Sequence, residues 1–494
     1  MKNRYLILLV LTLFIAAGCT DRFEDFNKDR KNPPATTPES LFSYGLIELS
    51  DQISSTNVNL NVFKLWSQYW TETTYIDEAN YDILNRTVAD GTFRALYRNS
   101  MKNFRDAKTI LMEDEPERVG DIAVLEILEA YTMVELIDLF GDVPYEEALD
   151  NDIVAPKFDD AASLYLALGA KVQAAITTLD EASVTFGSED FVFGGDTELW
   201  GRFGAGLLIK MGITIADVDE TTAEAWITAN EAIAIDADGN GIEALLDYQS
   251  SFPNTNTLYE DLVLSGRSDF VAANTVVDIM NGLDDPRREV YFQLRDTSSI
   301  EGVEHFVYIG GAYGYPSPYS AYSAPGVIFE DATFPGLLMT ESELLFYLAE
   351  AAARGMAVSN TDPEVYYNDA ITSSINWWAA MGGTSLDAAA YLANPAVAYA
   401  TAEGDWKQKI ATQSWIASYS RGFIGWTTWR RLDWPIFNLA ERTDSHADIP
   451  TRFTYPVNEQ TLNADNWSAA STAIGGDFLT TKLYWDINPV NVPE

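Results

Sequence analysis

The chain of 494 residues contains one cysteine and two histidines. A single cysteine cannot form a disulfide within the chain, so the fold has to be stabilised by packing. Neither His305 nor His446 has a second metal-ligating residue at the spacing of a zinc site. The sequence also lacks a phosphate-binding loop, a dinucleotide fingerprint and a nucleophile elbow. We therefore predict a protein that is not an enzyme, with no catalytic residues and no required cofactor.

Basic residues are scarce as well. The chain has 31 Lys and Arg against 74 Asp and Glu, a formal net charge of −43. A field of this sign repels polynucleotides and anionic lipid headgroups, which excludes a nucleic-acid partner and argues against a strongly anionic ligand. The many carboxylates leave one enzymatic alternative open, a secreted glycoside hydrolase that uses an acidic pair.

An uncharged apolar run lies near the start of the chain, and no later stretch approaches the roughly 18 uncharged apolar residues that a membrane-spanning helix requires. Two basic residues, an apolar stretch over 5–15 and three small residues precede Cys19, as in a signal peptide whose cleavage leaves a cysteine at the new N-terminus. We predict that residues 1–18 are removed and that Cys19 is acylated, which would hold the mature protein on a membrane. The alternative is an ordinary cleaved signal peptide followed by a chance cysteine.

The polar, proline-bearing residues 19–37 are predicted to form a tether, and residues 38–494 a single domain. Most of that domain has helical spacing of apolar residues. Pairs of helices joined by short turns, with small residues at crossing points, indicate a mostly α fold built on a tetratricopeptide-like helical-repeat scaffold. The predicted helices cover 41–52, 60–71, 93–112, 122–140, 161–178, 198–218, 223–233, 341–353, 363–378 and 407–419.

The segment 236–336 departs from this pattern. It is rich in Gly, Pro, Ser, Tyr and Asn and has little periodicity. An irregular stretch of this length within a compact domain is usually functional. We therefore predict a large loop-rich, partly irregular face on the helical scaffold, and we expect the ligand to bind there.

Several short motifs occur in a fixed order along the chain. They are FEDFN at 23–27, TTPE at 36–39, LIDLFGDVPYEEA at 136–148, FVFGGD at 191–196, DPR at 285–287, LAEA at 348–351, QSW at 413–415 and WTTWRR at 426–431. Each motif is modest alone. In combination with the leader and Cys19, they resemble the SusD/RagB family of outer-membrane nutrient-binding lipoproteins.

This resemblance implies a lipid-anchored protein on the outer surface of the outer membrane. It also implies a partner, a TonB-dependent transporter of the SusC type, to which the lipoprotein delivers an oligosaccharide. Some members of the family take oligopeptides, so a peptide ligand is an alternative within the same architecture.

Aromatic side chains are the natural contacts for sugar rings, because their faces stack on C–H groups with little loss of rotamer entropy. Trp66 and Trp70 are four residues apart in a predicted helix and would share one face, so Trp66 is expected in the core. The candidates for ligand contact near the end of this helix are Trp70, Tyr75, Tyr81 and Arg86.

A second group of aromatic residues lies on a Gly- and Pro-rich segment within 236–336. Buried tyrosines need hydrogen-bond partners for their hydroxyls, so five of them on one loop are unlike a core pattern. We predict ligand contact here, with contact to the transporter as the alternative. The residues are Tyr308, Tyr313, Tyr315, Tyr319 and Tyr322.

An acidic turn follows the helix predicted to end near residue 233. Its spacing matches a twelve-residue calcium loop, with aspartate in place of the usual final glutamate. It predicts a structural Ca²⁺ site, and the alternative is an acidic turn made of good turn formers. The predicted ligands are Asp236, Asp238, Asn240, the backbone carbonyl of Ile242, and Asp247.

Overall fold

The computed structural model describes residues 36–182, 185–300 and 303–489. The predicted signal peptide, Cys19 and nearly all of the predicted tether lie outside these ranges. The description begins just before helix α3 (Pro38–Ser54), where Pro38 occupies the first turn and the Thr37 hydroxyl accepts a hydrogen bond from the backbone N–H of Ser40. The predicted start of the folded domain at residue 38 therefore coincides with a capped helix.

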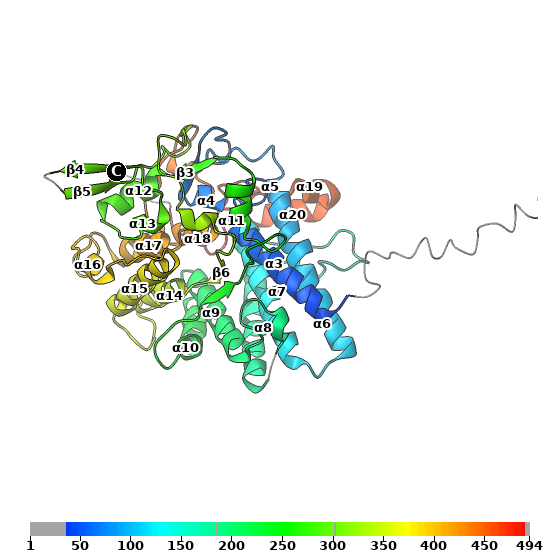
Figure 1. Cartoon of the computed structure of the whole chain (residues 1–494). Helices are drawn as coiled ribbons and strands as arrows, with labels where there is room; N and C mark the ends of the chain where they lie inside the picture. Colours follow the sequence, from blue (N-terminus) through cyan, green and yellow to red (C-terminus); the bar gives the residue numbers. More distant parts are fainter. Residues whose placement is uncertain (1–35, 183–184, 301–302, 490–494) are drawn as a thin grey trace, which may run out of the picture.

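Long helices that follow one another along the chain pack side by side, and successive pairs occupy the lower part of Figure 1. This arrangement confirms the predicted mostly α, tetratricopeptide-like fold. The long helices after α3 are α6 (Lys102–Asp114), α7 (Val119–Phe140), α8 (Ala161–Glu181), α9 (Thr197–Ile215), α10 (Glu220–Ala234), α14 (Glu341–Ala353), α15 (Pro363–Met381), α17 (Trp406–Ala417) and α18 (Gly422–Leu432).

Helix α7 lies at the centre of the scaffold, and nearly all of its side chains are buried. It ends where Gly141 adopts a φ of +86° and its N–H donates to the Ile137 carbonyl at 2.9 Å. Val143 then forms an isolated bridge with Asp159, just before α8. The Gly141–Pro144 motif therefore acts as an architectural exit that turns the chain from one helix toward the next.

Short elements make up the rest of the described chain, and β3, β4 and β5 lie in the upper part of Figure 1. The strands form three antiparallel pairs: β1 (Trp70–Glu72) with β3 (Phe270–Ala272), β2 (Ala244–Leu246) with β6 (Gly336–Met339), and β4 (Asp296–Ile300) with β5 (Val303–Val307). The shorter α-helices are α4 (Phe63–Trp66), α5 (Val88–Arg94), α11 (Thr257–Tyr259), α12 (Asn274–Gly282), α13 (Arg288–Tyr291), α16 (Ala388–Leu392), α19 (Val457–Leu462) and α20 (Ala464–Ala473).

The predicted helix over 60–71 is wrong for most of its length. Only α4 is helical, because Gln68 adopts a φ of +56° and the chain then enters β1. The side chain of Gln68 is fixed by distant partners: its Oε1 accepts from the Thr275 hydroxyl at 2.6 Å and from the Asn438 backbone N–H at 2.9 Å. Trp66 lies in the core as predicted, but Trp70 belongs to a strand and does not share a helix face with it.

Two consecutive arginines of α18 link this helix to the scaffold. The Arg430 guanidinium donates to the Asp138 carbonyl of α7 at 2.7 Å and lies 3.7 Å from the centre of the Trp426 ring. Arg431 donates to both carboxylate oxygens of Glu350 in α14, at 3.0 and 2.9 Å. Both guanidinium groups are buried, so each needs these acceptors to offset the loss of water.

Helix α8 is the one helix among the described residues that is long and apolar enough to cross a membrane. It packs against α7 on one side and α9 on the other. Its Lys171 donates to the Tyr145 hydroxyl at 2.7 Å. Helix α8 therefore buries one face against the scaffold and leaves the other exposed.

Helix α18 approaches α4 so closely that a glycine is required at the contact. A Cβ atom on Gly422 would lie 2.4 Å from the Lys64 nitrogen and 2.4 Å from the Phe63 carbonyl carbon, which are backbone atoms. We expect Gly422→Ala to lower the free energy of unfolding by about 1–3 kcal/mol, measured by urea denaturation. The control is Gly201→Ala in α9, where a Cβ meets nothing within 4 Å. This control should keep or raise stability by up to about 1 kcal/mol, and equal losses in both variants would contradict the prediction.

Candidate functional site

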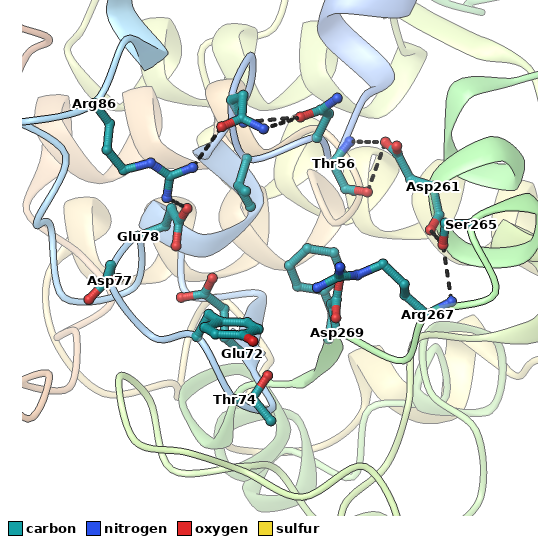
Figure 2. Close-up of a pocket in the computed structure, with 15 residues that line it drawn as sticks. Thr56, Glu72, Thr74, Asp77, Glu78, Arg86, Asp261, Ser265, Arg267 and Asp269 are labelled. Carbon is teal, nitrogen blue, oxygen red and sulfur yellow. Dashed lines mark hydrogen bonds and ion pairs between the residues drawn. The ribbon is translucent and has the colours of Figure 1, made fainter.

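A cavity of about 520 Å³ opens beside the β1–β3 pair. Three segments line it: the loop after α3, the chain from β1 to just before α5, and the stretch from η3 (Glu260–Leu264) into β3 (Figure 2). We call it the β1–β3 pocket. Its lining residues are Thr56, Asn57, Val58, Asn59, Glu72, Thr74, Tyr75, Asp77, Glu78, Arg86, Asp261, Ser265, Arg267, Asp269 and Phe270.

Strand pairing brings the two distant halves of the pocket together. Glu72 of β1 lies opposite Phe270 of β3, and the Thr73 N–H donates to the Asp269 carbonyl at 2.8 Å. On the other side, Asp261 accepts hydrogen bonds from the backbone N–H and the hydroxyl of Thr56, at 3.0 and 3.1 Å. The pocket therefore exists only after the chain has folded, because its sides are about 200 residues apart along the chain.

Of the first four predicted ligand residues, two line the pocket and two are buried in the core. Tyr75, with 74% of its surface exposed, and Arg86 both line the pocket. Trp70 is fully buried, and its indole N–H donates to the Tyr419 hydroxyl at 2.8 Å. Tyr81 is also buried and packs edge-on against Trp66. Trp70 and Tyr81 are therefore core residues, since neither ring is accessible to a ligand.

The tyrosine-rich segment divides in the same way. Tyr308 and Tyr313 are buried, which corrects their prediction as exposed contacts, and Tyr322 is half-buried. Tyr315 and Tyr319 expose 43% and 38% of their surface. The loop therefore has a buried side and an exposed side. On the buried side, the ring of Tyr313 packs against the ring of Tyr81.

The tyrosine-rich segment lies next to the pocket. The Gly314 N–H donates to the Thr71 hydroxyl at 3.2 Å, and the Ser317 N–H donates to the Glu72 carbonyl at 3.2 Å. Both acceptors belong to β1, the strand that also contributes Glu72 to the pocket. The two predicted aromatic clusters therefore meet at β1, and Tyr75, Tyr315 and Tyr319 are their exposed members.

Burial changes the chemistry of one pocket carboxyl. Loss of solvent raises the pKa of Glu72 to about 8, and the charges of Asp77 and Asp269 act in the same direction. The Ala79 N–H, which donates to Glu72 Oε2 at 3.0 Å, acts against the rise. At neutral pH the group is therefore mostly a neutral carboxyl, which can both donate and accept a hydrogen bond.

The predicted calcium loop forms a turn in which backbone N–H groups of the same turn donate hydrogen bonds to the Asp236 carboxylate. The Asp236 carboxylate accepts from the backbone N–H groups of Asp238 and Asn240 at 3.0 and 2.8 Å. It also lies 3.6 Å from the Arg202 guanidinium. Gly239, at a φ of +89°, closes the turn. The carboxylate expected to be the first cation ligand is therefore already engaged by backbone amides and by an arginine.

The later positions of the predicted loop follow a different course. The Ile242 N–H pairs back to the Ala234 carbonyl, and the chain then enters β2, which ends just before Asp247. Within the described residues, no group of three or more His, Cys, Asp or Glu side chains is placed to hold a metal ion. Asp247 follows β2, and its backbone N–H donates to the Phe191 carbonyl at 3.1 Å.

Comparison with known proteins decides the family. Residues 30–456 match the SusD-like family described as "Starch-binding associating with outer membrane". The chain belongs to this family. A comparison with curated proteins found no match.

Solved structures share the SusD-like fold over nearly the whole chain. A chitin-binding protein superposes with a TM-score of 0.79 at 23% identity, covering 92% of this chain and 100% of its own. A chitin-binding SusD homologue from Flavobacterium johnsoniae gives a TM-score of 0.74 at 22% identity, with 91% and 99% covered. A SusD homologue from Parabacteroides distasonis gives 0.74 at 20% identity, with 91% and 97% covered.

Sequence reasoning about this SusD-like chain missed much of the pocket. Asp261, Arg267 and Asp269 fall in the segment predicted to be irregular, and no local motif distinguishes them from other polar loop residues. The loop at 56–59 also carries no sequence motif that would mark it as part of a binding site. These residues become a site only through β1–β3 pairing and the Asp261 contacts to Thr56, which the local sequence does not specify.

Glu72 makes stability depend on pH in a defined direction. Its pKa is about 8 in the folded protein and near 4.5 when unfolded, so the folded state keeps a proton that the unfolded chain loses in between. Neutral Glu72 therefore contributes stability that is fully present below the unfolded pKa and is lost as pH rises through the folded pKa. Between the two pKa values the free energy of unfolding falls by up to about 1.4 kcal/mol per pH unit.

We expect Glu72→Gln to lose less stability than the wild type between about pH 5 and about pH 8, because an amide does not titrate in this range. Urea denaturation at both pH values measures the difference. Since the amide oxygen can still accept from the Ala79 N–H, the fold should be kept. If the difference in unfolding free energy between Glu72→Gln and the wild type does not change with pH, the raised pKa of Glu72 is contradicted.

Proposed function

We propose that this SusD-like protein is a lipid-anchored receptor on the cell surface that binds an oligosaccharide in the β1–β3 pocket and delivers it to a SusC-type TonB-dependent transporter. The observation that carries the proposal is the exposed ring of Tyr75 at a pocket otherwise lined mostly by polar side chains. Such a ring can stack on the C–H face of a sugar, while neighbouring polar groups bond its hydroxyls.

The polar groups around Tyr75 match the needs of a sugar. Asn57, Asn59 and Thr74 can each donate and accept hydrogen bonds, as hydroxyl groups do. Neutral Glu72 adds another donor and acceptor. Ligands of this kind are held by many modest contacts and one apolar platform, so the site serves binding and release without covalent chemistry.

The comparisons support a glycan more than the alternatives. The family description refers to starch, and two of the similar structures are described as chitin-binding. These names make neutral malto- and chito-oligosaccharides the first probes to test. Nothing in the comparisons supports an oligopeptide ligand.

Delivery to a transporter and lipid anchoring follow from the family and from the leader sequence. The family description places its members in association with the outer membrane. A lipid on Cys19 would keep the receptor beside a barrel in that membrane. Captured sugar would then pass directly to the barrel instead of diffusing away.

Tyr75→Ala tests the pocket as the sugar site. Losing the stacking ring should weaken binding of the best malto- or chito-oligosaccharide at least about tenfold, measured by isothermal titration calorimetry. The matched control is Tyr44→Ala, which removes another exposed tyrosine, 49% exposed, that does not line the pocket. Unchanged affinity in Tyr75→Ala would place the sugar elsewhere, and release of reducing sugar by the purified protein would favour the hydrolase alternative.

Cys19→Ser tests the lipid anchor. Acylation requires the thiol, so the variant should incorporate no labelled palmitate and should leave the membrane fraction, whereas the wild type should be labelled and stay membrane-bound. Fractionation followed by immunoblotting measures both proteins. If the variant remains attached to the envelope like the wild type, the anchor is not a lipid on Cys19.

A further inference from the structure

The β1–β3 pocket has an unequal set of charged side chains. Five of its lining residues carry a carboxyl group and two carry a guanidinium group. The carboxyl residues are Glu72, Asp77, Glu78, Asp261 and Asp269, and the guanidinium residues are Arg86 and Arg267. Figure 2 shows these side chains around the opening. The two guanidinium groups are the positive charges of the pocket with which an acidic ligand could pair. Whether the pocket accepts such a ligand therefore depends on whether these groups already have partners within the protein.

Arg86 is engaged by groups of the protein itself. Its Nη1 forms an ion pair with Glu78, whose side chain is nearly fully buried, and its Nη2 donates to Asn59 Oδ1 at 2.7 Å (Figure 2). A buried carboxylate that lost this partner would be left without compensation. The guanidinium is therefore held by the pocket wall and its charge is already balanced.

Arg267 is engaged in a similar way. Its Nε donates to Asp269 Oδ2, two residues along the chain, and its backbone N–H donates to the Ser265 hydroxyl at 3.1 Å. Thus the charge of each pocket guanidinium is already paired with a carboxylate of the pocket, and the carboxylate or sulfate of a ligand would have to compete with Glu78 and Asp269 for them.

The remaining carboxylates add negative charge or accept hydrogen bonds. Asp261 accepts from the Ser55 hydroxyl at 3.2 Å and from two groups of Thr56. Asp77 pairs at 2.8 Å with Arg442, which does not line the pocket. Arg442 offsets the charge of Asp77. Asp261 offers acceptors to the hydroxyls and amides of a neutral ligand, and its charge, within a chain whose net charge is −43, repels a ligand carboxylate.

We infer that the β1–β3 pocket selects oligosaccharides that carry no acidic groups, and that Asp269 and Glu78 enforce this selection by neutralising Arg267 and Arg86. The inference rests on the proposed function, because it names the class of sugar that the same site accepts. It makes these two carboxylates determinants of specificity rather than contacts to the sugar ring.

The experiment compares a neutral with an acidic oligosaccharide of equal length. The probes are maltohexaose, chitohexaose and hexagalacturonate, titrated calorimetrically into the full chain. The wild type should bind the better neutral probe at least about tenfold more tightly than hexagalacturonate. Because the exclusion is electrostatic, raising the salt concentration to about 0.5 M should narrow that ratio.

Asp269→Asn should release Arg267 and raise the affinity for hexagalacturonate, relative to the affinity for the neutral probe, at least about threefold. Glu78→Gln should act likewise through Arg86 and serves as the second variant. The control is Asp284→Asn, which makes the same change of net charge in an exposed ion pair with Arg288 outside the pocket. This control should leave the ratio of the two affinities unchanged.

The outcomes separate this inference from the proposed function. Wild-type protein that binds hexagalacturonate as tightly as the neutral probes overturns the charge selection and leaves the receptor function standing. The same holds if both pocket variants bind hexagalacturonate no better than the control does. If none of these sugars binds at all, the proposed function fails, and the inference fails with it.

Discussion

Buried arginines that find their acceptors on distant segments are the interaction on which this fold depends. With one cysteine, the chain has no disulfide to link its helices. Instead, Arg430 and Arg431 of α18 reach α7 and α14, and Arg452 donates to the Phe140 carbonyl at the end of α7 at 2.9 Å. A buried guanidinium without acceptors is costly, so these contacts specify how α18 and the C-terminal segment sit on the scaffold.

The position of α18 in turn sets the position of the pocket. Gly422 lets α18 lie directly against the backbone of α4, and α4 leads through the turn at Gln68 into β1. Strand β1 then pairs with β3, which brings Asp269 and Phe270 beside Glu72. The helical scaffold therefore acts on the ligand face through a short chain of close contacts.

The pocket itself combines one exposed ring with polar groups whose charges are largely balanced inside the protein. Tyr75 offers an apolar face, and Glu72 is kept mostly neutral by burial. Arg86 and Arg267 are paired with Glu78 and Asp269. A strongly acidic protein thus presents a site suited to hydroxyl groups, which agrees with a receptor that captures sugar reversibly and passes it on.

The sequence by itself determined the scaffold helices and the exit from α7 at Gly141, because each depends on residues within a few positions of one another. It also predicted Tyr75 and Arg86 as ligand contacts, and both residues line the pocket. Only the tertiary structure decided that Trp70 is buried, that the turn at Asp236 does not gather a set of calcium ligands, and which three segments form the pocket. Burial and strand pairing are set by contacts between segments far apart along the chain, and no local pattern of residue types contains that information.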